Sequence, residues 1–209
     1  MCPRLTIFRE ANRKLFPGWH NAPVPSFGPL DAPILVVGLA PGLRGANRTG
    51  RPFTGDHAGV LLYETLLRFG LAQGSYGADP ADNLTLSGCR IVNAVRCVPP
   101  GNKPLPLETA TCNRFLRAEL AAMSSLRAVL ALGVLAHAAV LRAVGLPLSR
   151  VGFRHGAVHP MPGGFLLADS YHVSRYNTST RRLTREMFEA TVGALLDRLG
   201  SDPPLRHFG

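Results

Sequence analysis

Four short, almost uninterrupted apolar runs stand out along the chain, at residues 34–37, 90–95, 126–132 and 165–168. An apolar run without polar alternation indicates a strand that is buried on both faces, which is typical of a parallel sheet. Between and after these runs, apolar residues recur at the three- and four-residue spacing of helices. The chain therefore predicts strands that alternate with helices.

The helical patterns cover residues 60–69, 108–122, 134–144 and 187–199. The last is the clearest, with apolar side chains at Met187, Phe188, Val192, Leu195, Leu196 and Leu199. This alternation predicts a three-layer α/β/α fold around a central four-stranded parallel sheet. A length of 209 residues with 46% hydrophobic residues favours one domain over residues 1–209, and a Gly-Ser-Asp-Pro-Pro segment predicts a loose tail at 200–209.

Charge narrows the class of partner. The chain has 23 Lys and Arg against 13 Asp and Glu, which gives a net charge of +10. A protein with such an excess of positive charge usually binds a polyanion. A basic protein without a nucleic-acid role stays open at this point. The longest apolar stretch, 128–141, is interrupted by His137 and is shorter than the roughly 18 residues of a membrane span. Because a charged segment stands where a signal peptide would begin, we expect a cytoplasmic protein without a membrane partner.

The segments after the predicted strands hold the candidate chemistry. In open α/β sheets, ligands bind beyond the carboxyl ends of the strands, and here residues 38–42, 96–102 and 170–177 concentrate Gly, Pro, Asn, His and Arg. The first opens a long loop, GLAPGLRGANRTGRPFTGDHAG, which is not a P-loop because Arg51 and Pro52 stand where Lys and Ser or Thr are needed. The loop suits close approach to phosphates or a base, although a flexible surface loop has a similar composition.

Asp56 is the only carboxylate in this loop, and it comes directly before a predicted helix. As an N-cap, it would be stabilised as the anion by the helix dipole, by about 0.3–1 kcal/mol. As a functional group, it would position a water molecule or stabilise a cation. Both interpretations stay open on the residues alone.

Three ordered motifs then resemble a known family. GLAPG with GANRTGRPFTGD, then NAVRCVPPGNKP, then YHVSRYNTST with RRLTREMF are similar to the uracil-DNA glycosylase superfamily, above all its family 5, the B-type iron–sulfur enzymes. The resemblance extends from residue 2 to about residue 199. It implies a monofunctional base-excision glycosylase that removes uracil, and often hypoxanthine or xanthine, from DNA and leaves an abasic site. We expect a monomer associated with the nucleoid. The alternative is a non-catalytic iron–sulfur DNA-binding module on the same scaffold.

The reaction that this resemblance implies assigns roles to residues. Breaking an N-glycosidic bond builds positive charge on the sugar and negative charge on the base, so the site needs an anion and hydrogen-bond donors. Leu39 and Ala40 are apolar where most of the superfamily has a polar or acidic residue, and family 5 implies that Asp56 positions the water. His172 is expected to donate to uracil O2, with a core histidine as its alternative. Asn177 is expected to hold the sugar or a water, with a turn residue as its alternative.

The remaining assignments concern the base and the DNA backbone. Asn93 carries the donor and acceptor that the O4–N3 edge of uracil requires, and Phe53 resembles the aromatic residue that stacks on the extracted base, unless it is an ordinary core residue. The base-binding set is Gly38, Ala40, Phe53, Asn93 and Asn102, with a turn residue as the alternative for Asn102. Contacts to DNA are expected from Arg48, Arg51, Lys103, Ser174 and Arg175, with Arg181 and Arg182 as further cations. A solvated basic face is the alternative for each arginine.

Four cysteines in a reducing compartment indicate metal ligands or core residues rather than disulfides. Cys2, Cys97 and Cys112 resemble the ligand set of family 5, in which a Cys-x-x-Cys pair and two later cysteines hold a structural [4Fe–4S] cluster. Only one cysteine of that pair is present, so we expect either a fourth ligand upstream of Met1 or an altered cluster. A Cys₄ zinc site is the alternative, and Cys89 is expected in the core.

Overall fold

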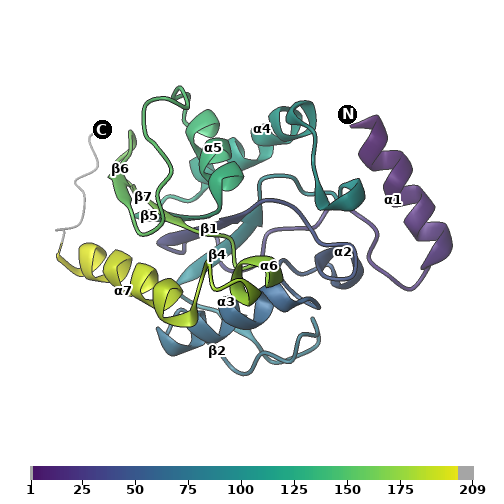
Figure 1. Cartoon of the computed structure of the whole chain (residues 1–209), viewed down its shortest axis with the longest axis horizontal. Coiled ribbons are helices and arrows are strands. Elements are labelled where there is room, and N and C mark those ends of the chain that lie inside the picture. The colour runs from purple at the N-terminus through teal and green to yellow at the C-terminus, as the bar shows by residue number, and fades with distance from the viewer. Residues whose placement is uncertain (1, 202–209) are drawn as a thin grey trace.

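A computed structural model describes residues 2–201 and shows a five-stranded sheet between two layers of helices (Figure 1). In the order β4-β1-β5-β7-β6, the strands are β4 (Cys89–Asn93), β1 (Ile34–Gly38), β5 (Ala128–Leu132), β7 (Leu166–Ser170) and β6 (Val158–Pro160). The four predicted runs form the parallel part of the sheet, in which β1 pairs with β4 and β5, and β5 pairs with β7. The predicted fold class is confirmed.

β6 is the strand that the apolar runs did not predict. It pairs antiparallel with β7 at one edge, so the sheet has five strands rather than four. Its three residues are partly or fully exposed, and they end in Pro160. Proline lacks an amide donor and is confined to the edges of sheets. A short, mixed edge strand of this kind gives no continuous apolar run.

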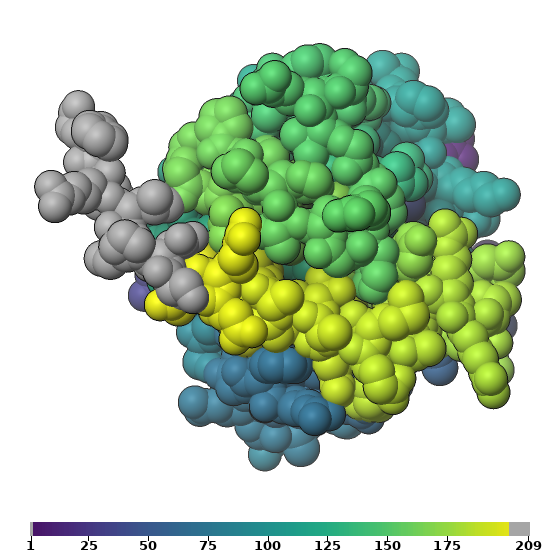
Figure 2. All heavy atoms as spheres, turned by 60° about the vertical axis from the view of Figure 1, so that its left-hand side comes forward, coloured from purple at the N-terminus to yellow at the C-terminus, as the bar shows by residue number. Residues whose placement is uncertain are grey.

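Helices cover both faces of the sheet. One face packs against α3 (His57–Arg68) and α7 (Arg185–Ser201), and the other packs against α4 (Pro106–Ala122) and α5 (Val134–Ala143). Figure 2 shows α7, in yellow, lying between the green segments around α5 and the blue segment that includes the end of α3. The molecule therefore has the three predicted layers.

The core is divided by the sheet itself. Because neighbouring residues of a strand point to opposite faces, Ile34 and Val36 join the cluster with α3 and α7, whereas Leu35 and Val37 join the cluster with α4 and α5. All five residues of β1 are buried. This burial on both faces is what the continuous apolar run indicated.

The smaller elements lie mostly at the edges of this core. They are α2 (Ala46–Thr49), β2 (Ala72–Gln73), β3 (Thr85–Leu86), the 3-10 helix η1 (Pro100–Asn102) and α6 (Arg175–Ser179). The N-terminal helix α1 (Pro3–Leu15) was not predicted, because only Leu5 and Asn12 are buried on it. An ion pair of 2.7 Å between Arg4 and Glu108 ties α1 to α4 instead.

The chain end differs from the prediction where it is described. Gly200 and Ser201 belong to α7, so the loose tail does not begin at residue 200. Residues 202–209 of the predicted tail lie outside the described residues. Within residues 2–201, no helix combines the length and apolarity that crossing a bilayer requires.

The central position of β1 gives a stability test. Leu35 is fully buried, so Leu35→Ala is expected to lower the free energy of unfolding by about 2–5 kcal/mol. Leu107 on α4 is 76% exposed, and Leu107→Ala is the matched control with an expected change within about 0.5 kcal/mol. Chemical denaturation followed by circular dichroism measures both values. Equal losses would contradict the placement of β1 in the core.

Candidate active site

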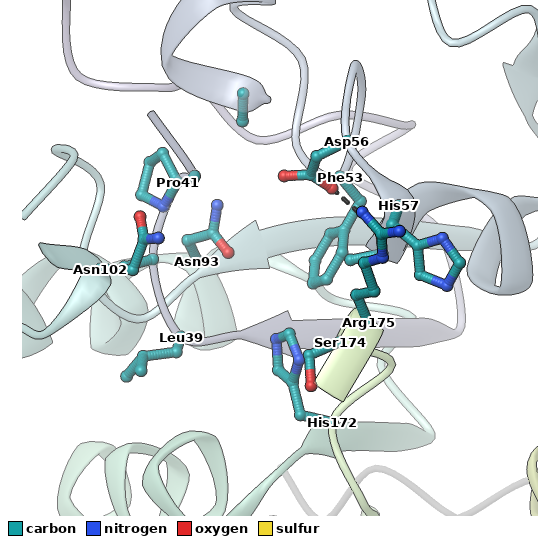
Figure 3. Close-up of a pocket in the computed structure, with 14 residues that line it drawn as sticks. Leu39, Pro41, Phe53, Asp56, His57, Asn93, Asn102, His172, Ser174 and Arg175 are labelled. Atoms are coloured by element: carbon teal, nitrogen blue, oxygen red, sulfur yellow. Dashed lines mark hydrogen bonds between the residues drawn. The ribbon is translucent and has the colours of Figure 1, made fainter. Parts of the chain in front are cut away.

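One cavity of about 560 Å³ opens where β1, β4 and β7 end (Figure 3). It brings together many of the predicted site residues, namely Ala40, Phe53, Asp56, Asn93, Asn102, His172, Ser174 and Arg175. Figure 3 shows Asp56 and His172 on opposite sides of the cavity, with Phe53 and Asn93 between them. The parallel strands place these loops together because their carboxyl ends share one edge of the sheet.

Asp56 both caps a helix and faces the cavity. It is the N-cap of α3, where its Oδ1 accepts a hydrogen bond of 3.1 Å from the amide of Ala58. Its other oxygen lies against the loop after β1, where a Cβ on Gly45 would stand 2.1 Å from Oδ2 and one on Gly42 would stand 2.7 Å away. Glycine at these two positions therefore leaves the space that the carboxylate occupies.

Opposing effects act on the charge of Asp56. Burial raises the pKa of its carboxyl group above the ordinary value, while hydrogen bonds from the amides of Ala58 and Gly59 and the nearby His57 oppose that rise. A desolvated carboxylate is a stronger base than an exposed one, because its charged form is less well solvated. The cavity thus holds an anion that is well suited to accept a proton.

His172 forms the opposite wall of the cavity. Burial lowers the pKa of its imidazole to about 4, so the ring is neutral at neutral pH. A neutral imidazole carries one N–H donor and one acceptor nitrogen. The ring centroid of His172 lies 6.0 Å from that of Phe53, and the two planes are inclined by 32°.

Asn177 holds His172 rather than facing the cavity. Its side-chain Nδ2 donates a hydrogen bond of 2.8 Å to the main-chain carbonyl of His172. It is not among the residues that line the cavity. The predicted contact of Asn177 with a sugar or a water does not fit this position, because the amide group already fixes the loop that carries His172.

Gly38 allows Phe53 and Asn93 to meet at the inner end of the cavity. It pairs with Asn93 across the sheet, and a Cβ on it would stand 2.5 Å from both Asn93 Oδ1 and Phe53 Cζ. Gly38 does not itself line the cavity. Asn93 is 6% exposed as a residue and lines the cavity, and its side-chain amide forms no hydrogen bond within residues 2–201. Because this amide borders the cavity without a partner, it is available to a bound molecule.

The predicted DNA contacts separate into rim residues and more distant ones. Ser174 and Arg175 line the cavity, and exposed Lys103 follows Asn102 directly. Arg48 is exposed but belongs to a neighbouring hollow, and it donates 2.8 Å to the carbonyl of Arg44. Arg181 and Arg182 are also exposed. The cations at the rim and beyond it form a surface that suits a polyanion.

Arg51 is the exception among these cations. Its side chain is 6% exposed, and its two terminal nitrogens donate to the carboxylate oxygens of Asp82 at 2.6 and 2.7 Å. Its Nε donates 2.8 Å to the hydroxyl of Thr54. The predicted phosphate contact of Arg51 is therefore not supported, because the guanidinium group is buried and fully engaged.

The sequence comparisons agree with this geometry. A family model described as the uracil DNA glycosylase superfamily matches residues 25–196. The chain belongs to this superfamily. Among curated relatives, a "Type-5 uracil-DNA glycosylase" of Thermus thermophilus is 49% identical and covers 90% of this chain and 88% of its own length. Proteins of the same description are 43% identical in Mycobacterium tuberculosis, covering 90% of this chain and 73% of their own, and 40% identical in Pyrobaculum aerophilum, covering 96% and 87%.

The expected cysteine ligands of this superfamily member lie in one place. Cys2, Cys97 and Cys112 form a small cluster with Leu5 and Val95, whereas Cys89 is fully buried in the main core, as expected. Burial raises the pKa of the thiols of Cys97 and Cys112, and Arg9 donates a hydrogen bond of 3.1 Å to Cys97 Sγ. All four cysteines are free thiols. Over residues 2–201, no three His, Cys, Asp or Glu side chains are arranged to hold a metal ion.

The cysteine cluster and the cavity share a wall. Ala40 packs against the cysteine cluster and also lines the cavity. The sequence placed Ala40 in the base-binding set, and the cavity lining agrees with that placement. Its second contact was not predicted, because nothing in the local sequence relates residue 40 to residues 2, 97 and 112.

Several lining residues of this glycosylase-family site were not singled out from the sequence. They are Pro41, Gly42, Ala46, His57 and Ala58. His57 joins α3 to α6 through a contact of 3.1 Å between its Nε2 and the hydroxyl of Thr178. Its position directly after Asp56 was the available signal, because the first turn of a helix shares the surroundings of its N-cap.

The buried state of His172 is testable by titration. We expect the imidazole of His172 to titrate with a midpoint near about pH 4, because burial disfavours the charged ring. Nuclear magnetic resonance of histidine-labelled protein measures this, and the His172→Gln variant assigns the signal. A midpoint near the ordinary 6.5 would show that the ring is solvated and would contradict its burial.

Proposed function

We propose that this protein is a DNA repair glycosylase that hydrolyses the N-glycosidic bond of uracil in DNA and leaves an abasic site. The observation that carries the proposal is the common cavity of Asp56 and His172. An anion and a neutral donor on opposite walls match the charges that develop on the sugar and the base. The description of the relatives as type-5 uracil-DNA glycosylases supports the same activity.

The base enters the cavity after it leaves the DNA stack. Extrusion of a nucleotide costs a few kcal/mol, and least for a mispaired base. The ring of Phe53 offers a flat apolar surface, and the unpaired amide of Asn93 offers a donor for O4 and an acceptor for the N3–H of uracil. Together these two residues hold the base and read its polar edge.

Bond breaking moves charge from the sugar to the base. The electron pair of the C1′–N1 bond passes to the base, where negative charge accumulates on the carbonyl oxygens. The N–H of His172 donates to uracil O2 and stabilises this charge, and a neutral ring does so without forming a salt bridge to the substrate beforehand. On the opposite side, the carboxylate of Asp56 stabilises the positive sugar. The oxygen of a water then bonds to C1′, and its proton passes to Asp56.

DNA is held by the cations around the cavity. Arg175, Lys103 and Arg48 are exposed, and Ser174 has a hydroxyl at the rim. Contacts of such side chains with phosphates position the duplex without reading its sequence. The net charge of +10 favours the encounter with DNA.

We propose that hypoxanthine and xanthine are substrates as well. The wall of the cavity formed by Leu39, Ala40 and Pro41 is apolar, so it imposes no hydrogen-bond pattern on one side of the base. The volume of about 560 Å³ also exceeds what a single pyrimidine ring needs. A base-release assay with one duplex per lesion ranks the three bases.

We further propose that the enzyme acts as a monomer in the cytoplasm, associated with the nucleoid. The basic surface favours association with chromosomal DNA. Light scattering in solution tests the monomer.

We also propose that Cys2, Cys97 and Cys112 are ligands of a structural [4Fe–4S] cluster. The three side chains meet in one cluster of contacts, and a metal centre stabilises thiolates that burial alone would protonate. Among the residues that the structure describes, no three His, Cys, Asp or Glu side chains are yet arranged to hold a metal ion, so the three cysteines and a fourth ligand would have to draw together when the cluster binds. When bound, the group would supply no chemistry for base release and would fasten α1 to the segment that carries Cys97.

Asp56 gives the sharpest test of the glycosylase. Asp56→Asn keeps an oxygen that caps the amide of Ala58 but removes the negative charge, so we expect release of uracil to fall roughly 100- to 1,000-fold with little change in stability. Asp56→Ala removes the cap too and is expected to cost a further ~1 kcal/mol of stability. Release of free uracil and alkali-labile strand breaks measure the activity. The rate should also fall as the pH is lowered, because Asp56 takes up a proton and loses its charge. Since burial raises the pKa of Asp56, this decrease should occur at a higher pH than for an exposed aspartate.

Two outcomes would overturn this assignment. A wild-type protein that shifts the uracil duplex in a gel but releases no base would support the DNA-binding module instead. A normal rate for Asp56→Asn would restrict Asp56 to capping α3.

The cluster is tested by analysis of the purified protein. We expect iron, acid-labile sulfide and broad absorbance near ~400 nm, and we expect Cys97→Ser to lose all three. Cys89→Ala is the matched control, because Cys89 lies in the main core and should leave the absorbance unchanged. Protein without iron and colour would contradict the cluster, and stoichiometric zinc would support the zinc site.

A further inference from the structure

Tyr76 lies outside the cavity lining and contacts the segment that carries Phe53. It belongs to the loop between β2 and β3 and does not line the cavity. Its hydroxyl donates a hydrogen bond of 3.0 Å to the carbonyl of Phe53, three residues before Asp56. One hydroxyl therefore holds the main chain of the segment that leads into Asp56.

The segment held in this way has an unusual backbone. Phe53 has a φ of +53° and Gly55 has a φ of +91°. A side chain in the left-handed region costs roughly 1–2 kcal/mol for a residue other than glycine, so the conformation of Phe53 must be maintained by its surroundings. The bond from Tyr76 to the carbonyl of Phe53 is a direct contact that does so.

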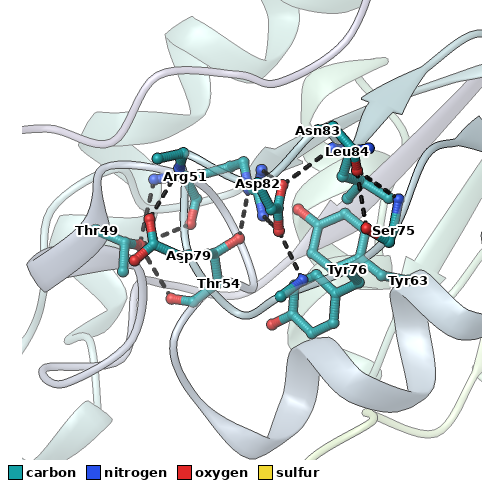
Figure 4. A network of polar contacts seen from close by, with 12 residues as sticks. Thr49, Arg51, Thr54, Tyr63, Ser75, Tyr76, Asp79, Asp82, Asn83 and Leu84 are labelled. Carbon is teal, nitrogen blue, oxygen red and sulfur yellow. Dashed lines mark hydrogen bonds and ion pairs between the residues drawn. The ribbon is translucent and has the colours of Figure 1, made fainter.

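Tyr76 is itself fixed by a buried network (Figure 4). Its ring stacks on that of Tyr63, with centroids 4.7 Å apart and planes inclined by 29°. The next residue, Gly77, donates its amide to Asp82 at 2.9 Å, and Asp82 is paired with Arg51 at 2.6 Å. The guanidinium of Arg51 lies over the ring of Tyr63 at 5.6 Å. The position of the Tyr76 hydroxyl is thus tied to Arg51 as well as to Phe53.

Gly59 lets the first turn of α3 reach the same hydrogen bond. A Cβ on Gly59 would stand 1.9 Å from the carbonyl oxygen of Phe53 and 2.1 Å from the hydroxyl of Tyr76. The amide of Gly59 also favours the charged form of Asp56. The hydrogen bond between Tyr76 and Phe53 therefore lies against the first turn of α3, which begins directly after its N-cap Asp56.

We propose that Tyr76 is a positioning residue that sets the distance between the ring of Phe53 and the carboxylate of Asp56. It acts through the main chain of Phe53 and does not touch the substrate. This inference rests on the proposed roles of Phe53 and Asp56 in base release. A misplacement of about 1 Å in such a constellation lowers a rate by as much as ~100-fold.

The variant Tyr76→Phe tests the inference, because it keeps the stacked ring and removes only the hydroxyl. We expect the single-turnover rate of uracil release to fall roughly 10- to 100-fold. Affinity for abasic product DNA should change less than about two-fold, because that ligand has no base to position and is held mainly through phosphates. A general loss of folded protein would reduce both values and the fraction of active sites together.

Tyr63→Phe is the matched control. It removes a hydroxyl from the other ring of the same stack, and that hydroxyl donates 2.6 Å to the carbonyl of Pro52, which also accepts from Thr54. We expect a loss of stability with a rate within about three-fold of the wild type. Equal decreases in rate for the two variants would overturn the inference, since loosening of the stack would then explain both.

The Asp56→Asn background separates this inference from the proposed function. If Tyr76 acts partly through Asp56, adding Tyr76→Phe to Asp56→Asn should lower the rate by a clearly smaller factor than in the wild type. A full, additive effect, or a wild-type rate for Tyr76→Phe alone, overturns the positioning role. A normal rate for Asp56→Asn alone instead overturns the proposed function.

Discussion

The parallel pairing of β1 with β4 and β5 is the constraint on which the site depends. It sets Gly38 beside Asn93 and directs the loop after β1 to the same edge of the sheet as the segment after β7. Residues from four distant parts of the sequence then surround one cavity. The helices on both faces bury β1 completely, and this burial keeps its register fixed because a shifted strand would exchange its two faces.

Much of the site is formed by the absence of side chains. Gly38 makes room for Phe53 and Asn93, Gly45 makes room for the carboxylate of Asp56, and Gly59 lets α3 approach the main chain of Phe53. Among the side chains that these glycines accommodate, the Asp56 carboxylate carries the charge. It is desolvated, and it accepts a hydrogen bond from the amide of Ala58 as the N-cap of α3. The alternatives of an N-cap and a functional anion were therefore not exclusive, since the same geometry provides both.

Features that follow from a local sequence pattern could be predicted. Features that depend on contacts between residues far apart in the sequence could not. The apolar runs located the four parallel strands, and the rule of strand ends located the cavity with Asp56, Asn93 and His172. Arg51 was predicted to contact phosphates. Because its ion-pair partner, Asp82, lies 31 residues away, no local pattern shows that the guanidinium group is already paired. Helix α1 was missed for a similar reason, because polar contacts rather than an apolar face attach most of it. Asn177 lies in α6, directly after the segment of His172, and its bond to the main-chain carbonyl of His172 is not encoded in any spacing.

Ala40 has a consequence of its own. It touches the sulfur-containing cluster on one side and the base cavity on the other. At this point the side chain of Ala40, a single methyl group, lies between the cysteine cluster and the cavity. A side chain larger than that of alanine at residue 40 would therefore extend into the cysteine cluster or into the cavity. A substitution at this residue thus affects the two sites together.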